Sequence, residues 1–140
     1  MRVVFAGQLK SGVSAKDMIL HLIAAYSAAG GSGYAIEFAG PAVESLTVEA
    51  RLTLCNMAVE FSAFTGIIAP DDKVFEYVKG RTCALSGESW KQAKENWGTL
   101  ATDDDANFDQ EIVIDCDTNK PTGTWTTAPK KANAVRGTGP

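Results

Sequence analysis

Apolar positions recur along the chain at two different spacings, and these divide it into strands and helices. Short β-branched or apolar runs are typical of strands and lie at residues 2–9, 34–40, 66–70 and about 108–116. Helical spacing is found in three longer segments, at residues 15–29, 47–65 and 88–100. Ser14 followed by Asp17 is typical of a capping box at the start of the first helix. A shorter helix is predicted from Asp71, where acidic residues suit the positive end of the helix dipole.

This order of elements predicts an α/β domain. Strands alternate with helices, which is typical of one sheet with helices against its faces. We expect a three-layer α/β/α sandwich with a small mixed sheet, in a single domain over residues 1–117. The wholly apolar run 66–70 is typical of a central strand covered on both faces. From residue 118 the chain is rich in Thr, Pro, Gly and Lys, so residues 118–140 are expected to be a loop and a partly flexible tail.

Composition and charge narrow the classes of function. The chain has 140 residues, 45% of them hydrophobic, which suits one globular domain with a core. Its formal net charge is -4, so neither nucleic acid nor an anionic membrane is an expected partner. No apolar run reaches the roughly 18 residues that a membrane span needs. The N-terminus lacks the apolar core of a signal peptide. A cytoplasmic protein with reduced cysteines is therefore expected.

The predicted helix 47–65 carries a narrow polar stripe with apolar residues on both sides. At about 100° per residue, the stripe consists of Glu49, Thr53, Asn56 and Glu60. The simpler interpretation is that it is the solvated side of the helix. The alternative is that Asn56 and Glu60 line a site, in which the carboxylate acts as acid or base and the amide binds an anion or a hydroxyl group. The spacing alone does not separate these two interpretations.

Other segments are weaker candidates for a site. The glycine-rich run 30–33 lacks the lysine of a phosphate-binding loop and is expected to be a turn. The acidic run 103–105 is expected to be a solvated loop, and His21 a structural residue. Cysteines are found at positions 55, 83 and 116. Because no CxxC spacing occurs, neither a zinc ribbon nor a redox pair is predicted, and Cys55 is expected to be a buried structural thiol.

Five segments, taken in order, resemble a known enzyme family. They are GVSAKDMILHLI, GGSGYAIEFAG, ESLTVEARLTLCNMAVE, GIIAPDDKVFEYVKGR and PTGTWTTAP. Together they are similar to the large, catalytic subunits of the 3-isopropylmalate dehydratase family, in the aconitase superfamily, from residue 3 to about residue 129. The most specific run is RLTLCNMAVE, which contains both Asn56 and Glu60. Related hydro-lyases, such as homoaconitase or aconitase, share this pattern and remain open as alternatives.

The resemblance implies an iron–sulfur-dependent hydro-lyase of leucine biosynthesis, a branch of branched-chain amino acid biosynthesis. Such enzymes dehydrate and rehydrate isopropylmalate with a [4Fe–4S] cluster, one iron of which acts as a Lewis acid. The family's Asn and Glu match Asn56 and Glu60. The Glu is expected to contact the iron-bound water or hydroxyl, and the Asn to support the surroundings of the cluster. The expected partners are the remaining large-subunit domains, a small swivel-domain subunit and a small hydroxy-acid substrate.

The chain also departs from the family pattern. The Ser-Cys-Thr-Asn loop and the Cys-x-x-Cys that hold the cluster do not occur in the sequence, nor does the Asp-Ser-His-Thr block. Ala50, Thr126 and Ala128 replace family residues. We expect that the chain alone holds no cluster and lacks activity, and that its uncovered apolar surface favours self-association. The alternative is a non-catalytic relic of the family that serves as a binding or assembly module.

Overall fold

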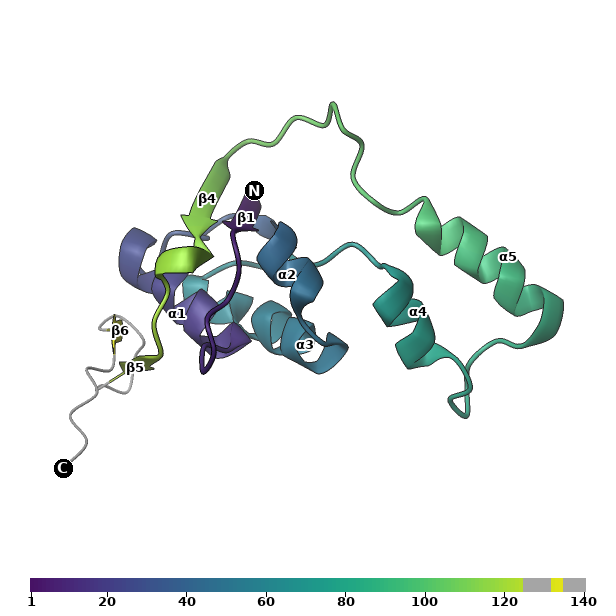
Figure 1. Cartoon of the computed structure of the whole chain (residues 1–140). Helices are drawn as coiled ribbons and strands as arrows, with labels where there is room; N and C mark the ends of the chain where they lie inside the picture. Colours follow the sequence, from purple (N-terminus) through teal and green to yellow (C-terminus); the bar gives the residue numbers. More distant parts are fainter. Residues whose placement is uncertain (125–131, 135–140) are drawn as a thin grey trace. The chain divides into compact units, whose positions relative to one another are not determined.

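The computed structural model describes residues 1–124 and 132–134. Contacts within the chain divide it into two compact units (Figure 1). The first, which we call the sheet unit, contains Met1–Ile68 and the chain from Phe108 onward; the second, the helical unit, is Ala69–Asn107. The expected domain boundary at residue 117 stays a prediction. None of the helices in the described residues combines the length and the apolar character that crossing a membrane requires.

The sheet unit is built on four strands that run parallel. They are β1 (Arg2–Ala6), β2 (Ala35–Ala39), β3 (Thr65–Ile67) and β4 (Glu111–Asp115), in the spatial order β3-β2-β1-β4. The connections between them contain α1 (Ala15–Tyr26), α2 (Pro41–Ser45), α3 (Val48–Asn56) and the 3-10 helix η1 (Met57–Phe61). The α/β prediction is confirmed. The sheet is parallel instead of mixed, because every connection is long enough to return to the starting edge.

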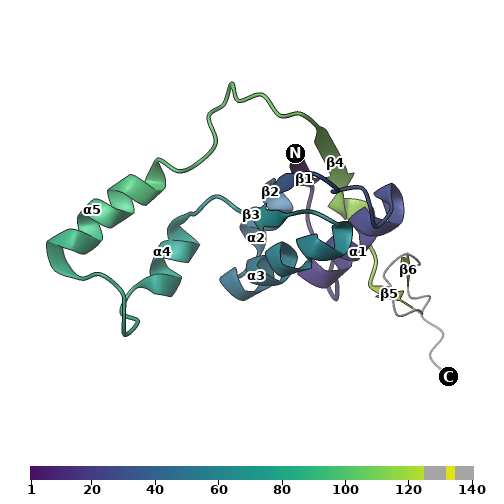
Figure 2. The same ribbon diagram turned by 180° about the vertical axis from the view of Figure 1, so that it is seen from behind.

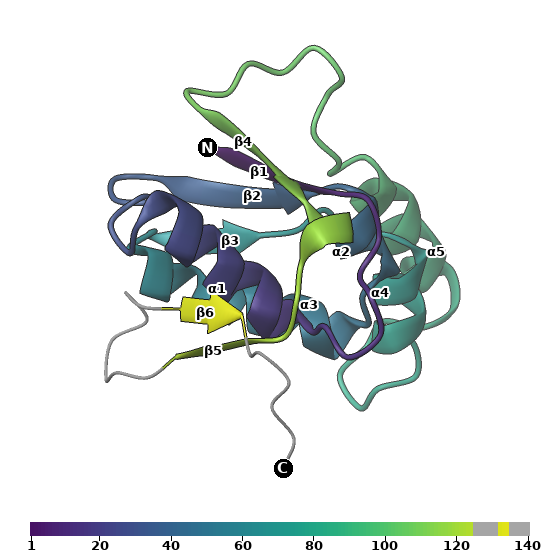
Figure 3. The ribbon, with the colours of Figure 1, turned by 60° about the vertical axis from the view of Figure 1, so that its left-hand side comes forward.

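One face of the sheet forms the core of this unit. Alternate residues of three strands are buried there, namely Val3, Phe5, Ile36, Phe38, Ile112 and Ile114. Helices α1 and α3 contact each other and add the buried residues Met18, Leu22 and Leu54 to the same cluster (Figures 2 and 3). These two helices form one layer against the sheet, and the second layer of the expected three-layer sandwich stays a prediction.

The other face of the sheet carries charged residues. The guanidinium group of Arg2 lies 3.8 Å from the carboxylate of Glu37 on β2 and 3.7 Å from that of Glu111 on β4. Val113 on the same face is 60% exposed. Because partly exposed ion pairs contribute little to stability, the buried face supplies most of the driving force for forming this sheet.

Two elements differ from the prediction. The predicted helix 47–65 is α-helical only to Asn56 and then narrows into η1, after which Ser62 adopts a left-handed φ of 67°. The apolar run 66–70 is not a central strand. It supplies the short edge strand β3, in which Ile67 is 55% exposed. Pro70 has no N–H group to donate to a neighbouring strand, and the ladder ends before it, at Ile67.

The segment after β4 is more ordered than expected. It forms the 3-10 helix η2 (Cys116–Thr118) and then β5 (Thr122–Thr124), which pairs antiparallel with β6 (Ala132–Ala134). Both strands contact α1. Part of the expected loop 118–140 therefore belongs to the sheet unit. Residues 126 and 128, which depart from the family pattern, lie outside the described residues.

The helical unit consists of α4 (Asp72–Val78) and α5 (Gly87–Gly98). Aromatic side chains join the two helices. The ring of Phe75 on α4 lies 6.1 Å from that of Trp97 on α5, and Trp97 lies 5.7 Å from Trp90 in an edge-on arrangement. The carboxylate of Asp71 accepts from the Val74 N–H at 3.2 Å and so caps α4.

Gly40 occupies a position that no other residue suits. Its φ is +103°, and a Cβ atom there would lie 2.5 Å from the carbonyl oxygen of Phe5. We expect Gly40→Ala to lower the free energy of unfolding by about 2 to 4 kcal/mol, the sum of backbone strain and overpacking. Urea denaturation followed by circular dichroism would measure the loss.

The matched control is Gly12→Ala. Gly12 also has a positive φ, +83°, but a Cβ atom would meet nothing within 4 Å. Only the strain of about 1 kcal/mol is then expected. Equal losses in the two variants would contradict the steric account of Gly40.

Candidate functional site

The two residues predicted to line a site, Asn56 and Glu60, lie where α3 passes into η1. Thr47 caps α3, accepting from the Ala50 N–H at 3.3 Å. Asn56 is the last residue of α3, Glu60 lies within η1, and both side chains are exposed. Neither side chain forms a hydrogen bond or an ion pair with the described part of the chain. Both are therefore open to a ligand or to a neighbouring protein surface.

The change from an α-helix to a 3-10 helix alters the relative directions of the Asn56 and Glu60 side chains. In a continuous α-helix, four residues turn through about 400°, which places the two side chains on one stripe. In a 3-10 helix, four residues turn through about 480°. The side chain of Glu60 is therefore rotated further from that of Asn56 than the sequence pattern predicts.

A buried phenylalanine holds η1 in place. Phe61 is fully buried, and its carbonyl oxygen accepts from the Gly31 N–H at 2.8 Å. A Cβ atom on Gly30 would lie 2.5 Å from the Phe61 ring, and one on Gly31 would lie 2.8 Å from it. The run 30–33 is thus a turn, as predicted, and its first two glycines make room for this ring. The contact fixes the backbone next to Glu60.

Apolar side chains flank the exposed polar residues on both sides, but only one of these flanks is buried. Leu54 and Phe61 belong to the core, so the wall that they form is packed against the sheet unit. On the other side Leu52 is 50% exposed and Val59 67%, and Phe64, which follows η1, is 82% exposed. The expected pair of apolar walls is therefore one buried face and one exposed apolar surface. Such a surface is typical of a protein contact or a binding groove.

The cysteines do not form a metal site. Among the described residues, no group of three or more His, Cys, Asp or Glu side chains is arranged to hold a metal ion. Cys55 is half-buried, Cys83 exposed and Cys116 fully buried. Burial, with the charges of Asp115 and Asp117, raises the pKa of the Cys116 thiol to about 11, and burial raises the pKa of Cys55. Because an iron–sulfur cluster binds thiolates, these residues do not fit a [4Fe–4S] cluster.

The other candidates from the sequence have no site geometry around them. His21 is half-buried on α1, in a helix whose neighbouring residues form the core. The acidic run 103–105 is exposed and belongs to no metal-binding group of the described residues. Both remain structural or solvated residues.

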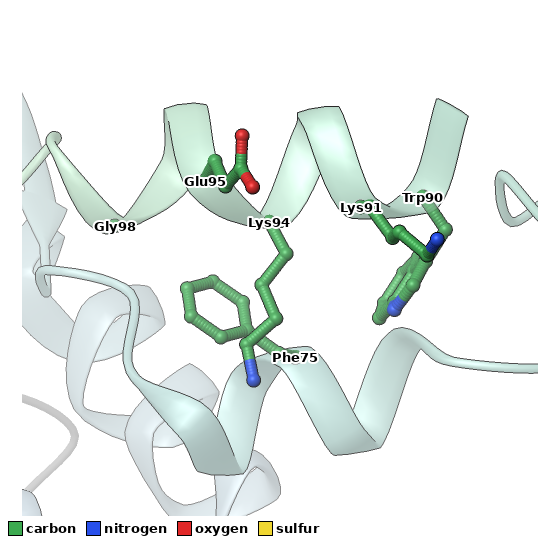
Figure 4. A pocket seen from close by; sticks show the side chains of 6 residues that line it. All are labelled: Phe75, Trp90, Lys91, Lys94, Glu95 and Gly98. Atoms are coloured by element: carbon green, nitrogen blue, oxygen red, sulfur yellow. The ribbon is translucent and has the colours of Figure 1, made fainter. Parts of the chain in front are cut away.

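The helical unit contains a groove that the sequence interpretation missed. It encloses about 420 Å³ between α4 and α5, and its lining residues are Phe75, Trp90, Lys91, Lys94, Glu95 and Gly98 (Figure 4). Lys94 reaches toward α4 beside Phe75, and its ammonium group lies 3.0 Å from the carboxylate of Asp72. Glu95 points away from α4. The groove is a gap in the aromatic packing of two helices, and both of its lysines are already paired, Lys91 with Glu88 at 3.1 Å and Lys94 with Asp72.

The burial of the thiols predicts their order of reaction. At about pH 8, roughly one Cys116 thiol in a thousand would be ionised with a pKa near 11. We expect an aromatic disulfide reagent to modify Cys83 quickly, and Cys55 and Cys116 at least about ten times more slowly until the chain is unfolded. Cys83→Ser should remove the fast phase. Three equally fast thiols in the folded chain would contradict the assignment.

Comparisons with known proteins agree with the resemblance in the sequence. The model of the Aconitase family (aconitate hydratase) matches residues 1–140. The chain is 50% identical, over 137 residues, to the "3-isopropylmalate dehydratase large subunit 1" of Bradyrhizobium diazoefficiens. The match covers 98% of this chain and 29% of that relative, so the chain spans less than a third of the relative's length. On these grounds the chain belongs to the aconitase family.

Proposed function

We propose that this chain contributes one domain to a hydro-lyase that dehydrates and rehydrates isopropylmalate. The observation that carries this proposal is the 50% identity to a 3-isopropylmalate dehydratase large subunit, which extends over 98% of the chain. Homoaconitase or aconitase activity on another small hydroxy acid is the alternative within the family. Leucine biosynthesis and a cytoplasmic location follow from the first assignment and are part of the proposal.

Glu60 is the proposed acid–base residue. Dehydration breaks a C–H and a C–O bond, so a base must accept the carbon-bound proton and an acid must protonate the departing hydroxyl group. Glu60 is exposed, and Phe61 anchors its backbone through the 2.8 Å hydrogen bond to Gly31. Its carboxyl group exchanges a proton with the hydroxyl group that leaves or adds. Asn56, at the end of α3, offers an amide that can hold a carboxylate or hydroxyl group.

The cluster of such an enzyme requires ligands from elsewhere. The described residues provide no set of three metal-binding side chains, so we assign the [4Fe–4S] ligands to other parts of the parent enzyme. The exposed apolar residues Leu52 on α3, Val59 next to Glu60, and Phe64 after η1 support a contact with those parts. The proposed partners are the other large-subunit domains and a small swivel-domain subunit; without them, the same surface favours self-association.

One prediction from the proposed function concerns the cluster. The purified chain is incubated anaerobically with iron and sulfide. We expect neither the stable visible absorbance of an iron–sulfur cluster nor iron bound in a stoichiometric amount, because the thiols of the described residues form no set of cluster ligands. A chain in which Cys83 is replaced by serine serves as control for adventitious binding at the exposed thiol. A stable chromophore that survives gel filtration in both proteins would contradict this part of the proposal.

Another prediction from the proposed function concerns the catalytic role of Glu60. This chain can replace the matching 137 residues of the Bradyrhizobium diazoefficiens subunit, and the chimera can be assembled with the small subunit and assayed for hydration of the unsaturated acid. We expect Glu60→Gln to lower kcat by about 10² to 10⁴, the usual contribution of general acid–base catalysis. The matched control is Glu49→Gln, an exposed glutamate at the other end of the same stretch.

Each outcome of this assay decides between the candidates. Equal losses in Glu60→Gln and Glu49→Gln would remove Glu60 from the mechanism. An active parent subunit whose chimera is inactive would favour the non-catalytic relic, which serves only for binding or assembly.

A further inference from the structure

Gly66 on β3 lies against the stretch of chain between the two candidate site residues. A Cβ atom on Gly66 would lie 3.0 Å from the Cα atom of Cys55 and 3.1 Å from the Cβ atom of Ala58. The ring of the buried Phe38 would lie closer still, at 2.8 Å. Cys55 is in the last turn of α3 and Ala58 is in η1, so the contact falls where one helix becomes the other. The lack of a side chain on Gly66 therefore lets this junction approach the sheet closely.

Gly31 makes a similar contact on the other side of Glu60. A Cβ atom on Gly31 would lie 2.8 Å from the ring of Phe61 and 2.9 Å from its carbonyl oxygen. That oxygen is the atom that accepts from the Gly31 N–H, so a side chain here would push against the hydrogen bond itself. The two glycines thus contact the chain at Ala58, two residues before Glu60, and at Phe61, directly after it.

Hydrogen bonds close the turn around Glu60 and return the chain to the sheet. The Ser62 N–H donates to the carbonyl oxygen of Val59 at 2.9 Å, across Glu60. The Phe64 N–H donates to the carbonyl oxygen of Tyr34, the residue before β2, at 2.8 Å. The backbone on both sides of Glu60 is therefore fixed, while the side chain of Glu60 is exposed.

The relative placement of Asn56 and Glu60 depends on this backbone. Both side chains are exposed, so packing around the side chains themselves does not orient them. Their separation and direction are set by residues 57–59, which pass over Gly66. A displacement of about 1 Å in a catalytic group can cost roughly a hundredfold in rate. Small shifts of the junction are therefore expected to affect catalysis more than they affect folding.

We propose that Gly31 and Gly66 are positioning residues, which let the backbone between Asn56 and Glu60 lie against the sheet unit and so fix how these two side chains are placed relative to each other. The close contacts are a property of this chain. Their effect on the reaction rests on the proposed function, in which Glu60 is the acid–base residue.

Amide hydrogen exchange of the unaltered chain tests the contacts without reference to activity. The N–H groups of Gly31 and Phe64 are expected to exchange at least about a hundred times more slowly than those of the exposed run 103–105, because both are held in hydrogen bonds between separate segments. Exchange of the Gly31 N–H as fast as that of the exposed run would overturn the inference.

A glycine-to-alanine variant tests the same contacts by disturbing them. We expect Gly66→Ala to speed the exchange of the Ser62 N–H by at least about tenfold, since the added Cβ atom pushes against the junction that precedes this turn. The matched control is Gly98→Ala, where a Cβ atom would meet nothing within 4 Å, and which should leave Ser62 unchanged. Unchanged Ser62 exchange in a folded Gly66→Ala chain would overturn the inference.

The chimera described above tests the effect on catalysis. We expect Gly31→Ala and Gly66→Ala each to lower kcat about tenfold and to change KM by less than about twofold, because a misplaced acid–base group weakens interactions made only in the transition state. Rates are divided by the amount of folded enzyme, measured by circular dichroism, so that loss of stability alone does not lower them. An unchanged kcat, or a rise in KM alone, would overturn the assignment.

Combination with Glu60→Gln separates positioning from a general structural role. A residue that acts through Glu60 has little left to affect once that carboxyl group is gone, so Gly66→Ala should lower the kcat of the Glu60→Gln chimera by less than about twofold. A full additional loss would overturn the assignment. If Glu60→Gln alone leaves kcat unchanged, the proposed role of Glu60 fails, while the exchange of the Ser62 N–H still decides the contacts.

Discussion

Burial of one face of the parallel sheet beneath α1 and α3 is the interaction on which the rest of the structure depends. Phe5 and Phe38, with ring centroids 6.2 Å apart, lie at the centre of this face. The β1 backbone at Phe5 leaves no room for a side chain at Gly40, and the buried Phe61 of η1 packs against the glycines of the α1–β2 turn. The opposite face carries an arginine between two glutamates, so it contributes much less apolar burial.

The candidate site follows from this packing. Phe61 enters the core between Gly30 and Gly31, and the chain leaves the α-helix just before it. As a result Glu60 lies on a short, anchored 3-10 turn with its side chain exposed. A general acid or base has to be held in position and yet reach the substrate, and this arrangement provides both.

Family membership indicates the type of reaction, whereas the structure of this chain indicates which part of the reaction its own residues can perform. The chain belongs to the aconitase family, while its three cysteines are an exposed thiol, a half-buried thiol and a fully buried thiol with a raised pKa. In our proposal, the chain supplies an acid–base residue, and the cluster is held elsewhere. The exposed apolar residues beside Glu60 are where those other parts would pack.

The sequence by itself determined the order of elements from β1 to β4, the α/β class, the capping box of Ser14 and Asp17, and the family. These depend on local periodicity, on residues three positions apart, and on motifs read along the chain. Only the tertiary structure decided that the long helix narrows after Asn56, that the apolar run 66–70 becomes an edge strand, and that Asp17 also binds Thr122. Each of these depends on a contact between residues far apart in the sequence, and such a contact leaves no mark in the local pattern from which elements are predicted.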